Sequence, residues 1–166
     1  MRADSAVVVS AGEPAYNRAV LAWIRTARRF CHLDPAERRL VLEAALFTVA
    51  ARVVLSALSL RTVRGLLARI PAVARPLPAE RAENIARAVT RARAVVPGAP
   101  CLVRALVVQA LLVRRGHPAH LRLGFVRSEG GVLSGHAWVE SEGRVFDDTG
   151  EASCYTPAQG FAGQRL

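Results

Sequence analysis

The fold class is decided by residues 97–125, PGAPCLVRALVVQALLVRRGHPAHLRLGF, in which a helical pattern gives way to a strand pattern. The prolines and glycine of 97–100 break any preceding helix, and apolar residues then recur at helical spacing over 101–115. Gly116 suits the left-handed position that follows a helix. From residue 120 the period becomes two, as in a half-buried strand. This stretch therefore predicts a helix followed by a sheet.

Two more strand patterns continue the sheet downstream. Residues 135–140 alternate again after a loop at 128–131, and a turn at 141–143 separates them from a short run at 144–146. Consecutive strands joined by short turns pair in the antiparallel sense. We therefore expect an α+β fold, in which N-terminal helices pack on a cysteine-bearing helix that lies against an antiparallel sheet.

Helices are predicted throughout the first half of the chain. The start Asp-Pro-Ala-Glu at 34–37 combines a capping side chain with a proline suited to the first helical position. It predicts a helix over 35–60, and Pro-Ala-Glu-Arg at 78–81 predicts another over 78–96. We also expect a helix over 16–30 and a proline-rich linker over 71–78. The chain is predicted to have three parts: an N-terminal extension (1–33), a helical subdomain (34–96) and a core (97–166). The helical subdomain and the core are expected to form one compact unit.

The helix over 35–60 is apolar on nearly every side. Such a helix is either buried all round or presents a face to a partner or a membrane surface, and burial is the expectation adopted here. Glu43 and Arg52 interrupt the run, and a membrane span needs about 20 apolar residues, so no transmembrane segment is expected. The apolar residues form one stripe (Leu40, Ala44, Phe47, Ala51, Val54, Leu58) with others outside it (Val41, Leu42, Leu46, Val53).

The composition describes a strongly basic folded domain. Basic residues number 23, all of them arginine, against 13 acidic residues, which gives a formal charge of +10 over 166 residues. That charge attracts anionic partners such as an acidic peptide or protein. The arginines are dispersed as singles and pairs without an RNA-binding signature, so no nucleic-acid partner is expected. With 52% hydrophobic residues, the chain has enough apolar material to bury a core.

Cysteine usage and the N-terminal sequence indicate the cytoplasm. The three cysteines are an odd number without CxxC spacing, which predicts neither a disulfide framework nor a zinc site. A reducing compartment fits best. Glu13 and Pro14 interrupt the N-terminal apolar run, so we predict no signal peptide. No metal or organic cofactor is predicted.

Two residues are candidates for nucleophilic chemistry. Cys101 occupies the first turn of the helix predicted over 101–115, where the aligned peptide dipoles favour a thiolate. His136 begins the strand HAWVE, and an imidazole beside a thiol can take its proton and return it to a leaving amine. The other cysteines, Cys31 and Cys154, are interpreted as structural.

A carboxylate could orient this histidine, and the hairpin register decides which one. A three-residue turn at 141–143 pairs His136 with Asp148, whereas a two-residue turn places Asp147 on the face of the histidine. Either carboxylate would fix the imidazole tautomer and stabilise the imidazolium that forms during attack.

These motifs resemble a known family. The stretches CLVRAL (101–106), RRGHPA (114–119), HAWVE (136–140) and GRVFDD (143–148) are similar to the transglutaminase-like leader peptidases of lasso-peptide biosynthesis. The resemblance covers about residues 34–150. It implies a transglutaminase-like or papain-like core and a Cys-His-Asp triad, carried over to Cys101, His136 and Asp148, the last from the family's spacing after the histidine.

The resemblance also implies a substrate and partners. The enzyme would be a cysteine peptidase that removes the leader from a ribosomally made precursor peptide, so that a macrolactam cyclase can close the ring. The chain resembles the stand-alone protease half of the split form, for which a separate leader-recognition protein is the expected partner. The apolar helix over 35–60 and the arginines, Arg38 and Arg39 among them, are candidate docking features. The alternatives are a transglutaminase-like acyl transferase and a catalytically silent peptide-binding module.

Overall fold

The structure, a computed structural model, describes residues 30–67, 69, 79–128 and 130–158. Internal contacts divide the chain into residues 1–33 and 34–166, and the second unit holds every element named below. The linker expected at 71–78 and all but the last residue of the helix expected over 16–30 lie outside the described residues. The described elements are helices α2 (Pro35–Ala57), α3 (Leu60–Leu67), α4 (Ala79–Ala92) and α5 (Cys101–Arg114), strands β1 (His120–Arg127), β2 (Leu133–Ser141), β3 (Arg144–Phe146) and β4 (Thr156–Pro157), and the 3-10 turn η1 (Ala152–Cys154).

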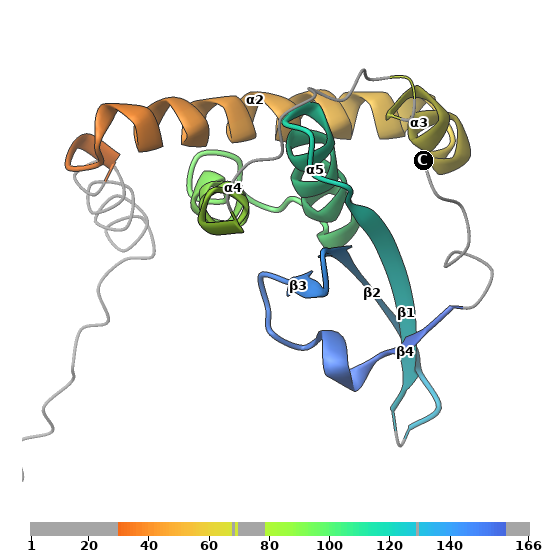
Figure 1. Cartoon of the computed structure of the whole chain (residues 1–166). Coiled ribbons are helices and arrows are strands. Elements are labelled where there is room, and N and C mark those ends of the chain that lie inside the picture. The colour runs from red at the N-terminus through yellow and green to blue at the C-terminus, as the bar shows by residue number, and fades with distance from the viewer. Residues whose placement is uncertain (1–29, 68, 70–78, 129, 159–166) are drawn as a thin grey trace, which may run out of the picture. The chain divides into compact units, whose positions relative to one another are not determined.

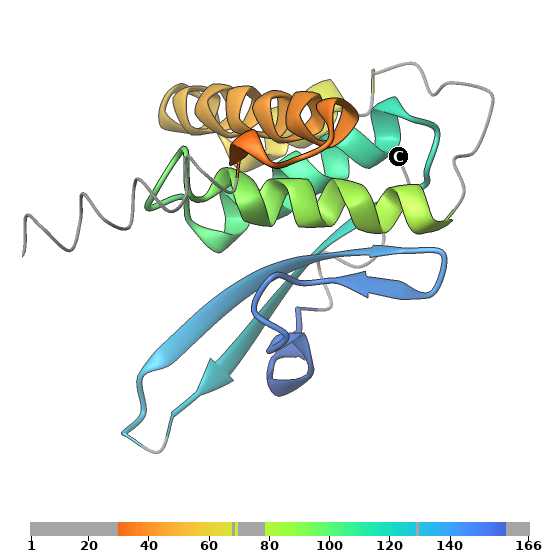
Figure 2. The ribbon, with the colours of Figure 1, turned by 90° about the vertical axis from the view of Figure 1, so that its left-hand side faces the viewer.

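The unit has a layer of helices over one face of an antiparallel sheet (Figures 1 and 2). The strand order is β3-β2-β1-β4, with every pairing antiparallel. Helix α5 packs on β1 and β2, while α2 and α4 pack on α5 and on each other. The predicted α+β fold is confirmed.

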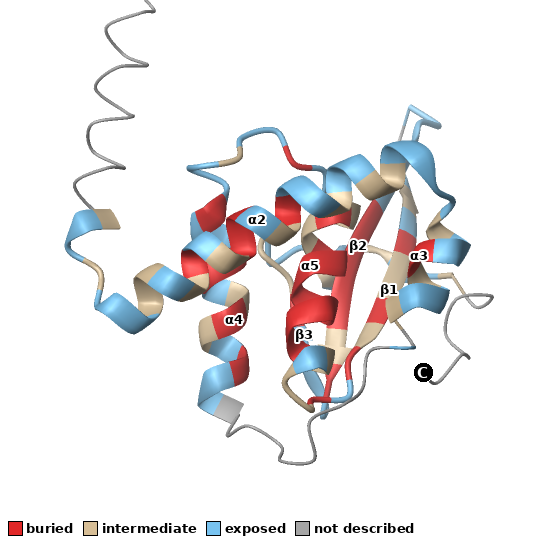
Figure 3. Cartoon of the chain, turned by 90° about the horizontal axis from the view of Figure 1, so that it is seen from above, coloured by how far each residue is buried: buried red, intermediate tan, exposed pale blue. Residues whose placement is uncertain are grey.

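Helix α5 forms the centre of the core because its sequence is apolar on all sides. Leu111 and Leu112 are fully buried, and the helix contributes nine buried residues (Figure 3). Its one buried amide, Gln109, donates from Nε2 to the carbonyl oxygen of Ala119 at 3.0 Å, which ties the helix to the start of β1. Burial at this level fixes the helix axis, and therefore its first residue, relative to the sheet.

The helix starts follow the predicted signals, whereas two helix ends do not. The helix expected over 78–96 ends at Ala92. Asp34 caps α2, and its side chain accepts from the backbone N–H of Ala36 at 3.0 Å. The helix expected to continue to residue 60 ends at Ala57. Ser59 then begins α3, because its hydroxyl accepts from the backbone N–H of Thr62 at 3.3 Å.

The expectation that α2 is buried on all sides was wrong. Val41 and Ala44 are buried against the other helices, but Leu46 is 67% exposed and Val53 62%. By length and composition α2 also meets the requirements of a membrane span, a test that core helices of soluble proteins pass as well. The exposed apolar residues follow helical spacing and form one face, called here the α2 ridge: Leu42, Leu46, Val49 and Val53.

The turn between β2 and β3 has two residues. Ser141 pairs with Arg144, and both residues between them are left-handed, Glu142 at a φ of 50° and Gly143 at 75°. Two successive left-handed residues form the hairpin turn whose twist matches that of the strands. The three-residue register, which would pair His136 with Asp148, is therefore not the one observed.

Candidate active site

Cys101 is the first residue of α5, directly after the cap residue Pro100. Its thiol is unpaired by disulfide and half-buried. No side chain caps this helix end, so the first backbone N–H groups remain available to a negative charge. The position suits a nucleophile whose reaction develops an oxyanion beside it.

His136 lies on β2 and is held from three sides. Its Nε2 lies 2.8 Å from Oδ1 of Asp147, and the residue is only 6% exposed. The ring of Trp138 stacks with the imidazole at 6.1 Å between centroids, and the ring of Tyr155 lies tilted at 5.0 Å. These contacts fix the plane of the imidazole and leave Nδ1 as the nitrogen available for proton transfer.

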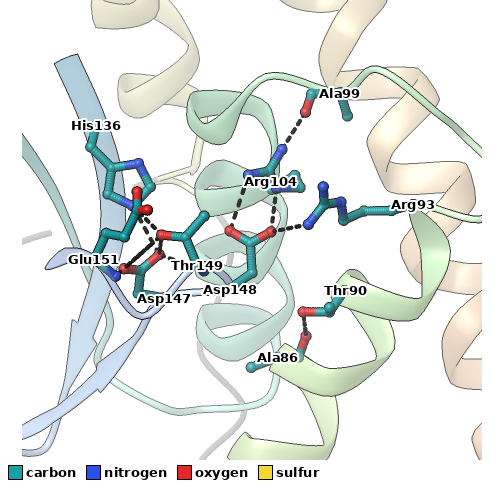
Figure 4. A network of polar contacts seen from close by, with 10 residues as sticks. All are labelled: Ala86, Thr90, Arg93, Ala99, Arg104, His136, Asp147, Asp148, Thr149 and Glu151. Carbon is teal, nitrogen blue, oxygen red and sulfur yellow. Dashed lines mark hydrogen bonds and ion pairs between the residues drawn. The ribbon is translucent and has the colours of Figure 1, made fainter. Parts of the chain in front are cut away.

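Asp147 is a buried carboxylate whose oxygens accept several hydrogen bonds (Figure 4). Besides His136, Thr149 donates from its backbone N–H at 3.1 Å and from its hydroxyl at 3.0 Å, and Ala152 donates its backbone N–H at 2.7 Å. Burial raises the pKa of Asp147, but the hydrogen bonds from His136, Thr149 and Ala152 outweigh it and hold the pKa below its ordinary value. The carboxylate is therefore ionised at neutral pH.

Asp148 lies on the other side of the chain from this group. Because side chains alternate along an extended segment, the residue after Asp147 points to the helical layer. There Asp148 accepts a hydrogen bond from a terminal nitrogen of Arg104 at 3.0 Å and another from Arg93 at 3.2 Å. Nε of Arg104 lies 2.8 Å from Oδ2 of Asp148 as an ion-pair contact. The prediction that Asp148 contacts His136 was wrong, and the two-residue alternative that selects Asp147 describes the geometry.

The structure connects the cysteine end of α5 to the aspartates without a direct bond from Cys101 to His136. Within the described part of the chain, no hydrogen bond joins the thiol to the imidazole. Arg104, one helical turn after Cys101, contacts Asp148, whose neighbour Asp147 holds the imidazole. The first turn of α5 and the loop after β3 are therefore linked through side chains.

Sequence reasoning missed the residues that support His136. Gly124 pairs with His136 across β1 and β2, and a Cβ there would lie 2.7 Å from the ring of Trp138. Only glycine leaves room for that ring beneath the imidazole. The spacing Asp-x-Thr could have indicated Thr149, since such a pair forms local turns. The contact of Arg104 with Asp148 could not be predicted from spacing, because it joins residues that are far apart in the sequence.

Two grooves meet at Asp147. One, of about 340 Å³, lies between α4, α5 and the end of β3 and is lined by Arg104, Val108 and Phe146 among others. The other, of about 510 Å³, is lined by residues that include Trp138 and Tyr155. Among the described residues, no group of three or more metal-binding side chains lies close enough together to hold an ion.

Comparison with protein families gives one match. The model of the transglutaminase-like superfamily matches residues 45–159, a range that contains Cys101, His136 and Asp147. The searches of curated proteins and of solved structures returned no match.

Proposed function

Since this chain belongs to the transglutaminase-like superfamily, which includes cysteine peptidases and acyl transferases, we propose that it is a cysteine peptidase. Its substrate would be the precursor of a lasso-type peptide, cleaved between leader and core. The observation that carries the enzymatic part is the buried His136–Asp147 pair, which is oriented by aromatic rings and packed on the sheet beneath the cysteine helix. The lasso assignment rests on the motifs shared with leader peptidases of that pathway.

The reaction would proceed in two halves. Nδ1 of His136 takes the proton of the Cys101 thiol, and the sulfur attacks the carbonyl carbon at the junction. The imidazolium returns the proton to the leaving amine as the C–N bond breaks, which releases the core and leaves the leader as a thioester. Water, deprotonated by His136, then breaks the thioester and restores the thiol. Throughout, Asp147 holds Nε2–H and stabilises the imidazolium.

The backbone N–H of Cys101 would donate to the oxyanion in both halves. It belongs to the uncapped end of α5, where the helix dipole favours negative charge. The groove beside Trp138 and Tyr155, whose rings contact His136, would offer room for peptide residues next to the cleaved bond.

The proposal includes partners and a compartment. A separate leader-recognition protein would deliver the precursor, a macrolactam cyclase would take the released core, and the reaction would occur in the cytoplasm. The α2 ridge is a candidate surface for the recognition protein, because Leu46 and its neighbours expose apolar area that the described fold does not cover.

Docking can be tested with two matched substitutions. Leu46 and Val132 are both 67% exposed, the first on the α2 ridge and the second in the loop before β2. We expect Leu46→Asp to weaken binding of the recognition protein at least tenfold in a calorimetric titration, while Val132→Asp leaves it unchanged. Equal affinities for both variants would exclude the ridge as the docking surface. Charge reversal at Arg38 and Arg39 tests the two arginines near the start of α2 in the same way.

The enzymatic proposal is tested by mass spectrometry of a precursor peptide incubated with the chain and the recognition protein. Wild type and Cys154→Ala should cleave one junction, whereas Cys101→Ala and His136→Ala should not. Cleavage by Cys101→Ala would contradict the mechanism. A product that carries an added amine instead of water would identify the acyl transferase, and binding that survives in Cys101→Ala without any cleavage by wild type would identify a peptide-binding module.

A further inference from the structure

We propose that Arg104 and Asp148 form a positioning pair, which holds the cysteine end of α5 in register with the loop that carries Asp147. The inference rests on the proposed function in one respect, that the reaction uses Cys101 and His136. Neither Arg104 nor Asp148 would touch the substrate. Their role would be to set the distance between the thiol and the imidazole.

The guanidinium of Arg104 contacts both Asp148 and the segment before Cys101. Its Nε lies 2.8 Å from Oδ2 of Asp148, one terminal nitrogen lies 3.0 Å from Oδ1, and the other donates to the carbonyl oxygen of Ala99. The two side chains are only 12% and 14% exposed. A planar guanidinium that donates to a carboxylate and to a carbonyl oxygen at once holds the two in a fixed relative geometry, which a lysine could not do.

The contacts connect the two halves of the proposed site. Ala99 lies two residues before Cys101 and Arg104 three residues after it, so one guanidinium holds the chain on both sides of the nucleophile. Asp148 adjoins Asp147, which holds His136. Figure 4 shows this path from the imidazole through both aspartates to Arg104 and Ala99.

A purely stabilising ion pair is the competing explanation. Exposed ion pairs contribute little to stability, and the contact of Arg93 with the same carboxylate is of that kind, since the Arg93 side chain is 51% exposed. Arg93 therefore supplies a matched control. It binds the same carboxylate from the turn after α4, and among the described residues its side chain makes no hydrogen bond to the segment around Cys101. Loss of Arg93 should leave the cysteine in place, whereas loss of Arg104 should not.

The test measures the thiol directly and needs no peptide substrate. The rate of Cys101 alkylation by iodoacetamide is followed by mass spectrometry from pH 6 to pH 8 in wild type, Arg104→Lys, Asp148→Asn, Arg93→Gln and His136→Ala. The exposed thiol of Cys154 serves as the internal reference. Thermal unfolding of each variant records the effect on stability separately.

We expect Arg104→Lys and Asp148→Asn to lower the Cys101 rate by about 10- to 100-fold at pH 6, toward the rate of His136→Ala, because a shift of about 1 Å suffices for such a loss. The Cys154 rate should not change, and Arg93→Gln should stay within about twofold of wild type. In Arg104→Lys and Asp148→Asn, peptidase kcat should fall while KM is kept.

A folded Arg104→Lys or Asp148→Asn protein with the wild-type Cys101 profile would overturn the proposal. So would a wild-type Cys101 that reacts no faster than Cys154. A fast Cys101 that depends on Arg104, in a protein that cleaves no precursor, would instead refute only the proposed function.

Discussion

Replacement of Asp147 by asparagine removes a negative charge from the group that orients His136, without changing its shape. Oδ1 receives His136 at 2.8 Å and Oδ2 receives the N–H of Ala152 at 2.7 Å. Both partners donate, so the amide nitrogen of asparagine meets a donor whichever way the side chain turns. The substitution therefore either loses the bond to the imidazole or leaves the N–H of Ala152 unpaired in a buried place.

The magnitude follows from these two contacts. A hydrogen bond to a charged group is worth about 1.5–3 kcal/mol, which corresponds to a loss of about 10- to 150-fold in kcat if the bond stabilises the imidazolium. The same loss should leave KM unchanged, because Asp147 would hold the histidine and not the peptide. Peptide cleavage followed by mass spectrometry measures both quantities. A kcat for Asp147→Asn within about threefold of wild type, with Asp148→Asn inactive, would refute the argument and return Asp148 to the role that hairpin counting first gave it.

The same variant carries a pH dependence of stability with a definite sign. The pKa of Asp147 in the folded chain lies below the ordinary 3.8, although burial alone would raise it, because the bonds from His136, Thr149 and Ala152 favour the carboxylate. The unfolded chain then binds more protons in this range, so the stabilisation is complete above the unfolded pKa and is lost as the pH falls through the folded pKa. Urea unfolding between about pH 5 and pH 3 should show a steeper loss for wild type than for Asp147→Asn. Parallel curves for the two proteins would contradict this.

Three further substitutions test the surroundings of the site. Gly124→Ala should lower kcat, because its Cβ would meet the ring of Trp138 at 2.7 Å. Gly135→Ala should be tolerated, because its Cβ would meet the half-exposed Phe125 at 3.2 Å. Equal activities of the two variants would show that the position of the Trp138 ring is unimportant. Leu111→Ala should lower the free energy of unfolding in urea by about 2–5 kcal/mol, since the side chain is fully buried, and a loss below about 1 kcal/mol would mean that the core refills the space. Glu142→Asn should raise that free energy by about 0.5–1 kcal/mol, because asparagine tolerates the left-handed φ of 50°. A lower free energy of unfolding would instead show that the Glu142 carboxylate, 3.8 Å from Nδ1 of the buried His117, stabilises the turn.

What the sequence predicts well is local. The start of α5 at Cys101 follows from a proline break and a helical period, and the strand that carries His136 follows from alternation. The positions of Cys101 and His136 could be predicted because helix starts and strand periods depend on neighbouring residues in the chain. The exposure of Leu46 could not be found in the same way, because it depends on which other helices pack against α2.

The choice between the two aspartates shows where local reasoning stops. A change of one residue in turn length exchanges the faces of Asp147 and Asp148, and the turn type depends on a left-handed glutamate that sequence statistics disfavour. In the observed register, adjacent carboxylates point to opposite sides of the chain, one to His136 and the other to Arg104. A site whose histidine and cysteine belong to different layers needs a connection to each, and two successive residues of an extended segment provide both. The acidic pair that looks redundant in the sequence is therefore best explained as two separate contacts, and each can be removed without deleting the other.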